Sequence, residues 1–322
     1  MSVLSVRDLS VDYATAAGPA KAVSHVSFDL DEGEFLAIVG ESGCGKTTLL
    51  FAVARLLTYP GSVVGGTVEF NGVDLMALSD EELRQTRWRD ISVVMQSAMN
   101  ALNPVLTIGA QLADACRAHT DWDDERVAER SAEVLSMVSI DPVHLRSYPF
   151  QLSGGMRQRA MIAMALLLEP RLVIMDEPTS ALDVVAQRSL MRQVENLRQR
   201  LGFSVIFVTH DMSVVSHFSD RLAVMYAGEV VELGRTRAVF DDPRHPYSQG
   251  LMEAFPSLVG SPRTLTGIAG NPPSLVDPPG GCLFAPRCAY VMDECWSDAP
   301  ELVTRDNHAV RCHLVNPVVR RG

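Results

Sequence analysis

Residues 35–50 read FLAIVGESGCGKTTLL, and this stretch decides the fold. Five apolar residues typical of a buried strand lead into a glycine-rich turn with the spacing Gly40-x4-Gly45-Lys46-Thr47, and a helix-forming run follows. In this order, backbone N–H groups and a helix N-terminus point at a phosphate, and the glycines let the backbone come that close. The stretch therefore predicts a phosphate-binding loop, with Lys46 on the β- and γ-phosphates and the Thr47 hydroxyl on Mg²⁺.

A second apolar strand, in residues 171–178 (RLVIMDEP), ends in Asp176 and Glu177. An acidic strand end by itself is usually a solvated turn. Together with the preceding loop it predicts a catalytic pair, in which Asp176 holds Mg²⁺ through water and Glu177 orients and deprotonates the attacking water.

Residues 151–159 (QLSGGMRQR) place Ser153 as a helix cap just before two glycines and a helix. A helix start with exposed N–H groups and a serine hydroxyl is a second phosphate site. Because one chain cannot easily wrap both sites around one nucleotide, the sequence predicts that a second subunit takes part.

Length and composition indicate a globular chain: 322 residues at 47% hydrophobic can bury a large core and suggest two domains. The formal charge of −11 argues against nucleic acid as a partner. The longest apolar run, residues 160–168, is about half of the ~20 residues needed to cross a bilayer, and the N-terminus lacks the pattern of a secretory signal. We therefore expect a cytoplasmic chain without a membrane span, in which structural disulfides are rare.

Alternating and periodic patterns predict a mostly parallel sheet flanked by helices. A hairpin is expected at Asn71-Gly72. The expected strands are residues 3–11, 23–30, 35–39, 172–175 and 204–210, and the expected helices lie in residues 107–140, 154–168 and 184–200.

The C-terminal segment differs in composition, because 11 of the 18 prolines lie between Pro243 and Pro317. Proline disfavours helix interiors and central strands, so we expect loops, small elements and little core there. The segment also carries four of the six cysteines, with the spacing x5, x6 and x16: Cys282, Cys288, Cys295 and Cys312. Four thiolates suit an iron–sulfur cluster or zinc, although zinc sites commonly use closer pairs, and the spacing alone leaves a metal and unligated thiols open.

Taken together, these residues resemble the ATPase subunits of ATP-binding-cassette (ABC) transporters, whose LSGGQ signature appears here as LSGGM in residues 152–156. The resemblance implies a phosphate-loop (RecA-like) α/β core with an antiparallel β subdomain and a helical signature subdomain. It also implies catalytic roles for Glu177, for His210 on the γ-phosphate and for Gln96, which senses Mg²⁺ and the membrane subunit. Mg²⁺ would be held by Thr47, Gln96 and Asp176.

The same resemblance assigns the nucleotide contacts. Tyr13 would stack on adenine, although a lone tyrosine is most often a half-buried surface residue. Ser153, Gly154 and Gly155 would contact the ATP of a partner subunit, and Ser180, Ala181, Leu182 and Asp183 would form the D-loop. The implied contacts within the chain are Tyr13, Gly40, Glu41, Ser42, Gly43, Cys44, Gly45, Lys46, Thr47 and Thr48.

Two further stretches, ALNPVLTIGAQL in residues 101–112 and DDPRHPYSQGL in residues 241–251, resemble the D-type ATPases of oligopeptide and dipeptide permeases. The same stretches also resemble the ATPases of nickel permeases, almost as closely. Ser97 and Phe150 depart from that pattern on the face towards the membrane subunits. The stretch GCLFAPRC resembles the extension in which four cysteines hold a 4Fe–4S cluster; zinc is the alternative, and Cys44 and Cys116 are expected to be ordinary small residues.

The resemblance implies an ATPase domain in residues 1–240, with a helical subdomain at about 98–158, and an extension in residues 241–322. It implies ATP-driven peptide import, a related but distinct second ATPase, two membrane permease subunits and, indirectly, an extracytoplasmic peptide-binding protein. The chain would lie peripherally on the cytoplasmic face of the cell membrane. A soluble ABC ATPase outside transport and an iron–sulfur sensor that only binds nucleotide are the competing interpretations.

Overall fold

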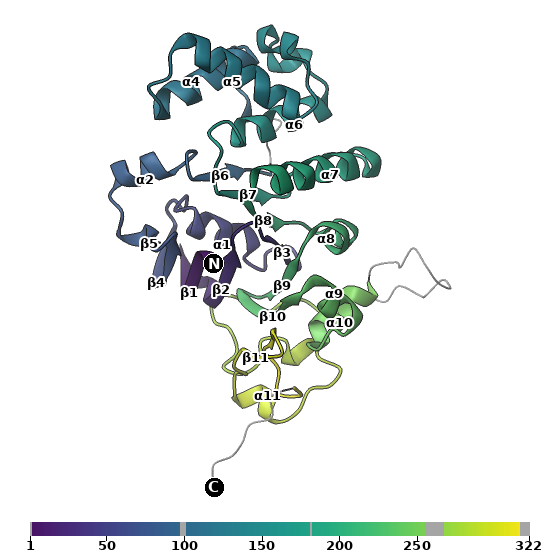
Figure 1. The fold of residues 1–322 in the computed structure, drawn as a ribbon. Helices are drawn as coiled ribbons and strands as arrows, with labels where there is room; N and C mark the ends of the chain where they lie inside the picture. The colour runs from purple at the N-terminus through teal and green to yellow at the C-terminus, as the bar shows by residue number, and fades with distance from the viewer. Residues whose placement is uncertain (1, 97–100, 181, 255–266, 316–322) are drawn as a thin grey trace. The chain divides into compact units, whose positions relative to one another are not determined.

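The computed structural model describes residues 2–96, 101–180, 182–254 and 267–315 (Figure 1). Its contacts divide the chain into two compact units. The first unit comprises Met1–Leu4, Leu30–Phe35 and Phe70–Phe207, and the second comprises Ser5–Asp29, Leu36–Glu69 and Val208–Gly322. Both units are built from segments far apart in the sequence.

The first unit contains parallel strands with a buried centre. β6 (Ile91–Val94) pairs in parallel with β7 (Leu172–Asp176), with Ile91 opposite Leu172 and Val94 opposite Met175. β8 (Ser204–Val208) is the other neighbour of β7. Every residue of β7 is buried, as expected for a strand covered on both faces. The acidic end of β7 therefore emerges from a rigid element.

Helices of the first unit begin at side-chain caps, which explains where the predicted helical patterns start. Thr107 and Asp123 cap two separate helices in residues 107–140, where the sequence predicted one helical region. The helices are α2 (Asp80–Thr86), α4 (Ile108–His119), α5 (Asp124–Met137), α6 (Gly154–Ala165) and α7 (Val184–Leu201), with short turns η1 (Leu75–Ala77), η2 (Pro142–Arg146) and η3 (Pro149–Gln151).

Three long strands lie next to one another in the order β2, β1, β4. Asn71 and Gly72 both have positive φ, which is the backbone that a tight hairpin turn requires, and the predicted turn is confirmed. The strands are β1 (Ser2–Thr15), β2 (Gly18–Asp31), β4 (Gly61–Phe70) and β5 (Val73–Asp74), which follows the turn.

In the second unit, strands from the C-terminal segment extend a sheet that contains β3, the strand leading into the phosphate loop. β3 (Phe35–Val39) pairs in parallel with β9 (Arg221–Tyr226), and β9 is antiparallel to β10 (Glu229–Arg235). β12 (His308–Val310) then pairs with β10, and β11 (Val303–Arg305) pairs with β12. The helices of this unit are α1 (Lys46–Val53), α8 (Met212–Phe218), α9 (Thr236–Asp241), α10 (Pro246–Glu253), η4 (Ala285–Arg287) and α11 (Glu294–Ser297).

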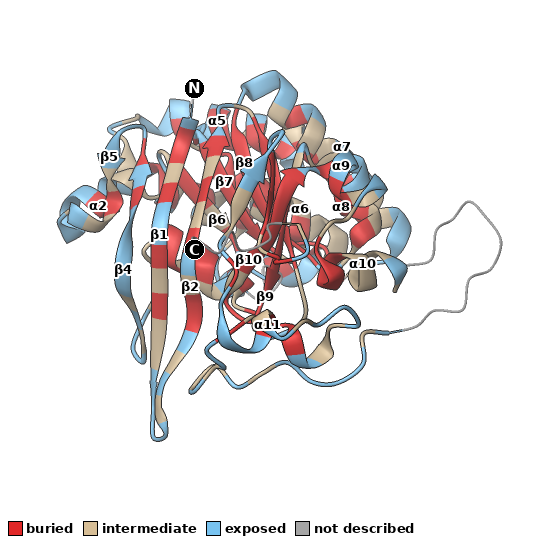
Figure 2. Ribbon diagram, turned by 90° about the horizontal axis from the view of Figure 1, so that it is seen from below, coloured by how far each residue is buried: buried red, intermediate tan, exposed pale blue. Residues whose placement is uncertain are grey.

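The C-terminal segment shares the core of the second unit, contrary to the expectation of a segment poor in core. Tyr247 and Phe284 belong to one buried cluster with Val39, Val224 and Tyr226. Buried residues run along β9 and β10 in Figure 2. The physical reason is that aromatic rings bury a large area each, so a proline-rich segment needs few of them to join a core.

The predicted domain division at residue 240 stays a prediction, as does the helical subdomain at about residues 98–158. No helix in the described parts of the chain is long and apolar enough to span a membrane.

Candidate nucleotide-binding site

The phosphate loop joins β3 to α1, as predicted. Gly45 precedes the first residue of α1 and has φ of +102°, in the left-handed region. A Cβ at this position would collide with the backbone oxygen of Ala22. Both observations require glycine here, because no other side chain tolerates this backbone without strain. The loop is therefore shaped by the chain that surrounds it.

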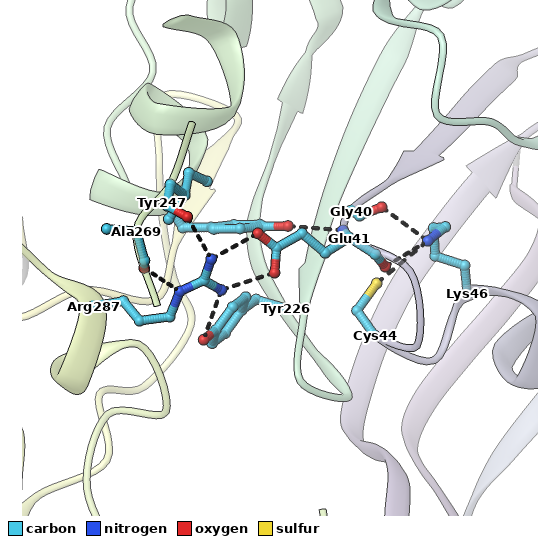
Figure 3. A network of polar contacts seen from close by, with 9 residues as sticks. Gly40, Glu41, Cys44, Lys46, Tyr226, Tyr247, Ala269 and Arg287 are labelled. Carbon is cyan, nitrogen blue, oxygen red and sulfur yellow. Dashed lines mark hydrogen bonds and ion pairs between the residues drawn. The ribbon is translucent and has the colours of Figure 1, made fainter. Parts of the chain in front are cut away.

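Lys46 is buried and bonded within the loop. Its Nζ donates to the carbonyl oxygens of Gly40 and Glu41, both at 2.9 Å, and lies 3.6 Å from the Cys44 sulfur (Figure 3). These oxygens are weaker ligands for an ammonium group than an anionic phosphate. A triphosphate in the loop would therefore compete favourably for Lys46.

Other predicted contacts of the loop lie in the same unit. Ser42, Gly43 and Thr47 are exposed, and Thr48 is partly buried. The Tyr13 hydroxyl is 3.5 Å from Oγ1 of Thr48, so a half-buried ring stands beside the first turn of α1. Cys44 is a buried thiol whose pKa is raised by burial, in line with an ordinary small residue.

Glu41 is held from two sides (Figure 3). Its backbone N–H donates to the Tyr247 hydroxyl at 2.9 Å. Its carboxylate accepts two bonds from the Arg287 guanidinium, at 2.8 and 2.9 Å. Neither Tyr247 nor Arg287 was predicted as functional. The sequence marked them only by their position in the DDPRHPYSQGL and GCLFAPRC stretches, which resemble permease ATPases.

His210 is exposed in the turn that follows β8. The next residue, Asp211, caps α8 by accepting from the Ser213 backbone N–H at 2.8 Å. The Thr209 hydroxyl accepts from the Asp211 backbone N–H at 3.0 Å. The turn is thus held by hydrogen bonds on the carboxyl side of His210, while its ring reaches solvent.

In the first unit the structure brings Gln96 and Glu177 together. Nε2 of Gln96 donates to a carboxylate oxygen of Glu177 at 2.8 Å. Glu177 follows the buried Asp176 at the end of β7 and has φ of +44°, a conformation uncommon for residues other than glycine. Such backbone strain persists only where the surrounding structure imposes it, and it gathers at active sites.

Ser153 caps α6, as the sequence predicted. Its hydroxyl accepts from the Met156 backbone N–H at 3.2 Å, and Ser153 is exposed. A Cβ at Gly155 would meet open space within 4 Å. The N-terminus of α6 is therefore accessible to a ligand.

Asp183 caps α7 and accepts from the backbone N–H groups of Val185 and Ala186 at 3.0 and 2.9 Å. Ser180 is exposed next to it. Ala181 and Ser97 lie outside the described residues. Asp183 thus has a structural role as a helix cap, whatever else it contacts.

The cysteine cluster predicted as a metal site is not supported by the geometry. Across the described residues, no group of three or more His, Cys, Asp or Glu side chains is arranged to hold a metal ion. All six cysteines, each in a described part of the chain, are free thiols. Burial, followed by the nearby thiols of Cys295, Cys312 and Cys288, raises the pKa of Cys282 to about 11. In this structure the four cysteines therefore do not form a metal-binding group.

Comparisons with known proteins cover both parts of the chain. The family profile described as ABC transporter matches residues 23–180, and the profile described as oligopeptide/dipeptide transporter, C-terminal region, matches residues 231–295. The chain is 45% identical over 316 residues to the dipeptide transport ATP-binding protein DppD of Bacillus subtilis, across 97% of this chain and 94% of that protein. It is 41% identical over 320 residues to the oligopeptide transport ATP-binding protein OppD of the same species, across 98% and 89%.

A solved structure is similar over the nucleotide-binding part. The dimeric ATP-binding cassette MJ0796, bound to ADP and phosphate after hydrolysis, has a TM-score of 0.65 and 29% sequence identity with this chain. The likeness covers 73% of this chain and 99% of that one.

Proposed function

The chain belongs to the family of ABC transporter ATPases that serve oligopeptide and dipeptide permeases, and from this membership we propose which of its residues perform each step. Its fold is the phosphate-loop fold of ABC ATPases, with mixed α/β sheets. The chain binds and hydrolyses ATP, and this hydrolysis powers peptide import through a membrane transporter.

Glu177 is the general base for the attacking water, and Gln96 positions its carboxylate. The observation that carries this assignment is the 2.8 Å hydrogen bond between the two side chains, at the end of the buried strand β7. The amide of Gln96 orients the carboxylate of Glu177. Its position is set by the backbone of a rigid strand, which is what a general base requires.

Lys46 binds the β- and γ-phosphates, and the ring of Tyr13 stacks on adenine. His210 donates a hydrogen bond to the γ-phosphate, where charge develops during transfer. The oxygen atoms of Thr47, Gln96 and Asp176 would hold Mg²⁺, a hard cation that prefers such ligands and neutralises the phosphate oxygens.

Ser153, Gly154 and Gly155 cap the nucleotide of a partner ATPase, and Ser180 and Asp183 lie on the same interface. Support comes from the exposed start of α6, with its free space at Gly155. Membrane permease subunits and a second ATPase are the partners that follow from the family. We propose that the second ATPase is a related but distinct chain, that an extracytoplasmic protein delivers the peptide, and that the complex holds this chain on the cytoplasmic face of the cell membrane.

The test is ATP turnover of the assembled transporter with Glu177→Gln. Loss of a positioned general base should lower turnover by about 10²- to 10⁴-fold. The matched control is Glu301→Gln, an exposed carboxylate of the C-terminal segment, which should turn over at the parental rate. If Glu177→Gln also hydrolysed ATP at the parental rate, the assignment of the base would be wrong.

We also propose that Cys282, Cys288, Cys295 and Cys312 bind a 4Fe–4S cluster. Support comes from the resemblance of the GCLFAPRC stretch to the cluster-binding extension and from the Tyr290 backbone N–H, which donates to the Cys288 sulfur at 3.4 Å. Cluster binding would have to bring together side chains that are not arranged as metal ligands in this structure. Hydrogen bonds to sulfur are typical of such clusters.

Protein purified without oxygen should contain iron and acid-labile sulfide, and Cys282→Ser should lower both. Cys116→Ser, a buried thiol of α4, is the control. If the purified protein contained no iron and no sulfide but stoichiometric zinc, the site would be a zinc site. If it contained neither a cluster nor zinc, the proposal of a metal site would be refuted. Neither result would affect the ATPase assignment.

A further inference from the structure

The phosphate loop is rich in glycine, and side chains of the C-terminal segment hold it at Glu41. Gly40, Gly43 and Gly45 all have positive φ, and glycine is the residue that loses most conformational freedom on ordering. Glu41 lies among them and is the loop residue that side chains of the C-terminal segment hold. The conformation of the loop therefore depends on Tyr247 and Arg287.

The Arg287 side chain is only 4% exposed, and Glu41 is 27% exposed, so this ion pair is largely removed from water. Two parallel bonds join the guanidinium to the carboxylate, which is the geometry that arginine provides and lysine cannot. The carboxylate raises the pKa of Arg287, so the guanidinium remains charged. Such a pair fixes orientation, unlike a surface salt bridge.

Further contacts fix the guanidinium itself. Nε of Arg287 donates to the Ala269 carbonyl oxygen at 2.9 Å (Figure 3). Nη2 donates to the Ile268 carbonyl oxygen at 3.2 Å. Nη1 also donates to the Tyr226 hydroxyl at 3.3 Å, and the guanidinium lies 5.6 Å from the centre of that ring. These contacts fix the orientation of the guanidinium that binds Glu41.

The pair contacts an aromatic cluster of Tyr226, Tyr247 and Phe284. The ring centres of Tyr226 and Tyr247 are 4.7 Å apart, and Phe284 stands edge-on to Tyr226 at 5.2 Å. Phe284 directly precedes η4, which ends in Arg287. The C-terminal segment is therefore packed so that the position of Arg287 is set by buried rings.

We propose that Arg287 is a positioning residue for ATP binding, which holds Glu41 so that the phosphate loop keeps its nucleotide-binding shape and the Glu41 charge does not repel the triphosphate. This inference rests on the proposed ATPase function. Two physical effects carry it. A loop that is competent only part of the time weakens apparent affinity in proportion to the competent fraction. An unneutralised carboxylate in the loop also repels an anionic ligand.

Both effects act on binding and leave the chemical step unchanged. Glu177 and Gln96, which act on the attacking water, belong to the other compact unit. Loss of Arg287 should therefore raise the KM for ATP of the assembled transporter while kcat at saturating ATP stays close to parental. A purely structural role would lower the melting temperature and the active fraction, and would leave the KM of the folded molecules unchanged.

The experiment measures the affinity of the full-length chain for ATP, its melting temperature without nucleotide, and the KM and kcat of the assembled transporter. The variants are Arg287→Gln, Arg287→Lys, Glu41→Gln and the double variant Arg287→Gln with Glu41→Gln. Arg305→Gln is the matched control, because Arg305 is an exposed arginine of the same segment.

We expect Arg287→Gln to weaken ATP binding by about 5- to 150-fold, the range for leaving one partner of a buried hydrogen-bonded pair unsatisfied. Arg287→Lys should fall between this variant and the parent, because it keeps the charge and loses the fork. Adding Glu41→Gln to Arg287→Gln should restore part of the affinity, since it removes the repelling charge. Arg305→Gln should bind as the parent does.

ATP affinity within twofold of parental in Arg287→Gln would overturn the inference. So would a loss that accompanies a lowered melting temperature and that Glu41→Gln does not relieve, because the role would then be structural. If the parent itself bound no ATP, the proposed function would fail, which separates that failure from failure of the positioning role.

Discussion

Two helix N-termini, at α1 and α6, present backbone N–H groups for phosphate binding, and they are built in opposite ways. α1 begins after Gly45, which offers no side-chain cap, and its loop is held by contacts with distant residues such as Tyr247 and Arg287. α6 begins after Ser153, whose own hydroxyl caps the helix within three residues.

The difference shows how each site gains its shape. The start of α1 lies against other backbone, since a Cβ at Gly45 would collide with the Ala22 carbonyl oxygen. The start of α6 is exposed, and the Ser153 hydroxyl caps it within its own first turn. A site that is shaped locally and left open is suited to contact a nucleotide held by another chain.

The largest expected effect is on folding stability, when alanine replaces a glycine at the start of α1 or at the start of α6. Gly45→Ala places a Cβ in left-handed backbone against the Ala22 carbonyl, so it should lower the free energy of unfolding by about 3 kcal/mol or more and abolish measurable ATP binding. Gly155→Ala should keep or raise stability, by up to about 1 kcal/mol, because alanine favours a helix. Chemical denaturation and ATP titration measure both. Equal stability losses in the two variants would contradict the comparison.

The second largest effect should be a loss of folding stability in acid, caused by His245 beside the Tyr247 contact to the phosphate loop. Burial, and then the charge of Arg311, lowers the pKa of His245 to about 3, and its Nδ1 accepts from the Tyr247 backbone N–H. The unfolded chain takes up a proton below about pH 6.5 while the folded chain does not, so stability should fall as the pH falls. The loss should be about 2 kcal/mol between pH 7 and pH 5.

His245→Asn is the matched variant for this prediction, because its side-chain oxygen can still accept from the Tyr247 N–H. The free energy of unfolding, measured from pH 7 to pH 5, should depend less on pH in this variant than in the parent. Parallel curves for the two proteins would show that His245 is not the group that titrates.

The smallest expected effect is at the cap of α6. Ser153→Ala should cost about 1 kcal/mol of local helix stability, seen as faster hydrogen exchange at the Met156 amide, while Ser153→Thr should keep most of the protection. ATP affinity of the single chain should remain parental, and turnover of the assembled transporter should fall. A loss of ATP affinity in the single chain would mean that Ser153 serves its own nucleotide.

Much of the fold could be predicted from local signals. Apolar runs bounded by turn residues located β3 and β7, and caps at Thr107, Asp123 and Ser153 begin three of the helices. The C-terminal segment was harder, because proline content suggested little core and gave no indication that Phe284 and Tyr247 join the cluster around Tyr226. Spacing likewise put four cysteines in one segment, while the folded segment does not arrange them as metal ligands.

By itself, the sequence determined the phosphate loop, the acidic strand end and the serine-capped helix, because each depends on backbone preferences within about ten residues. Tertiary structure alone decided which side chains complete them. Gln96 meets Glu177 from 81 residues away, and Arg287 meets Glu41 from 246 residues away. Such contacts follow from how strands and buried rings pack, and no local pattern of residues encodes that packing.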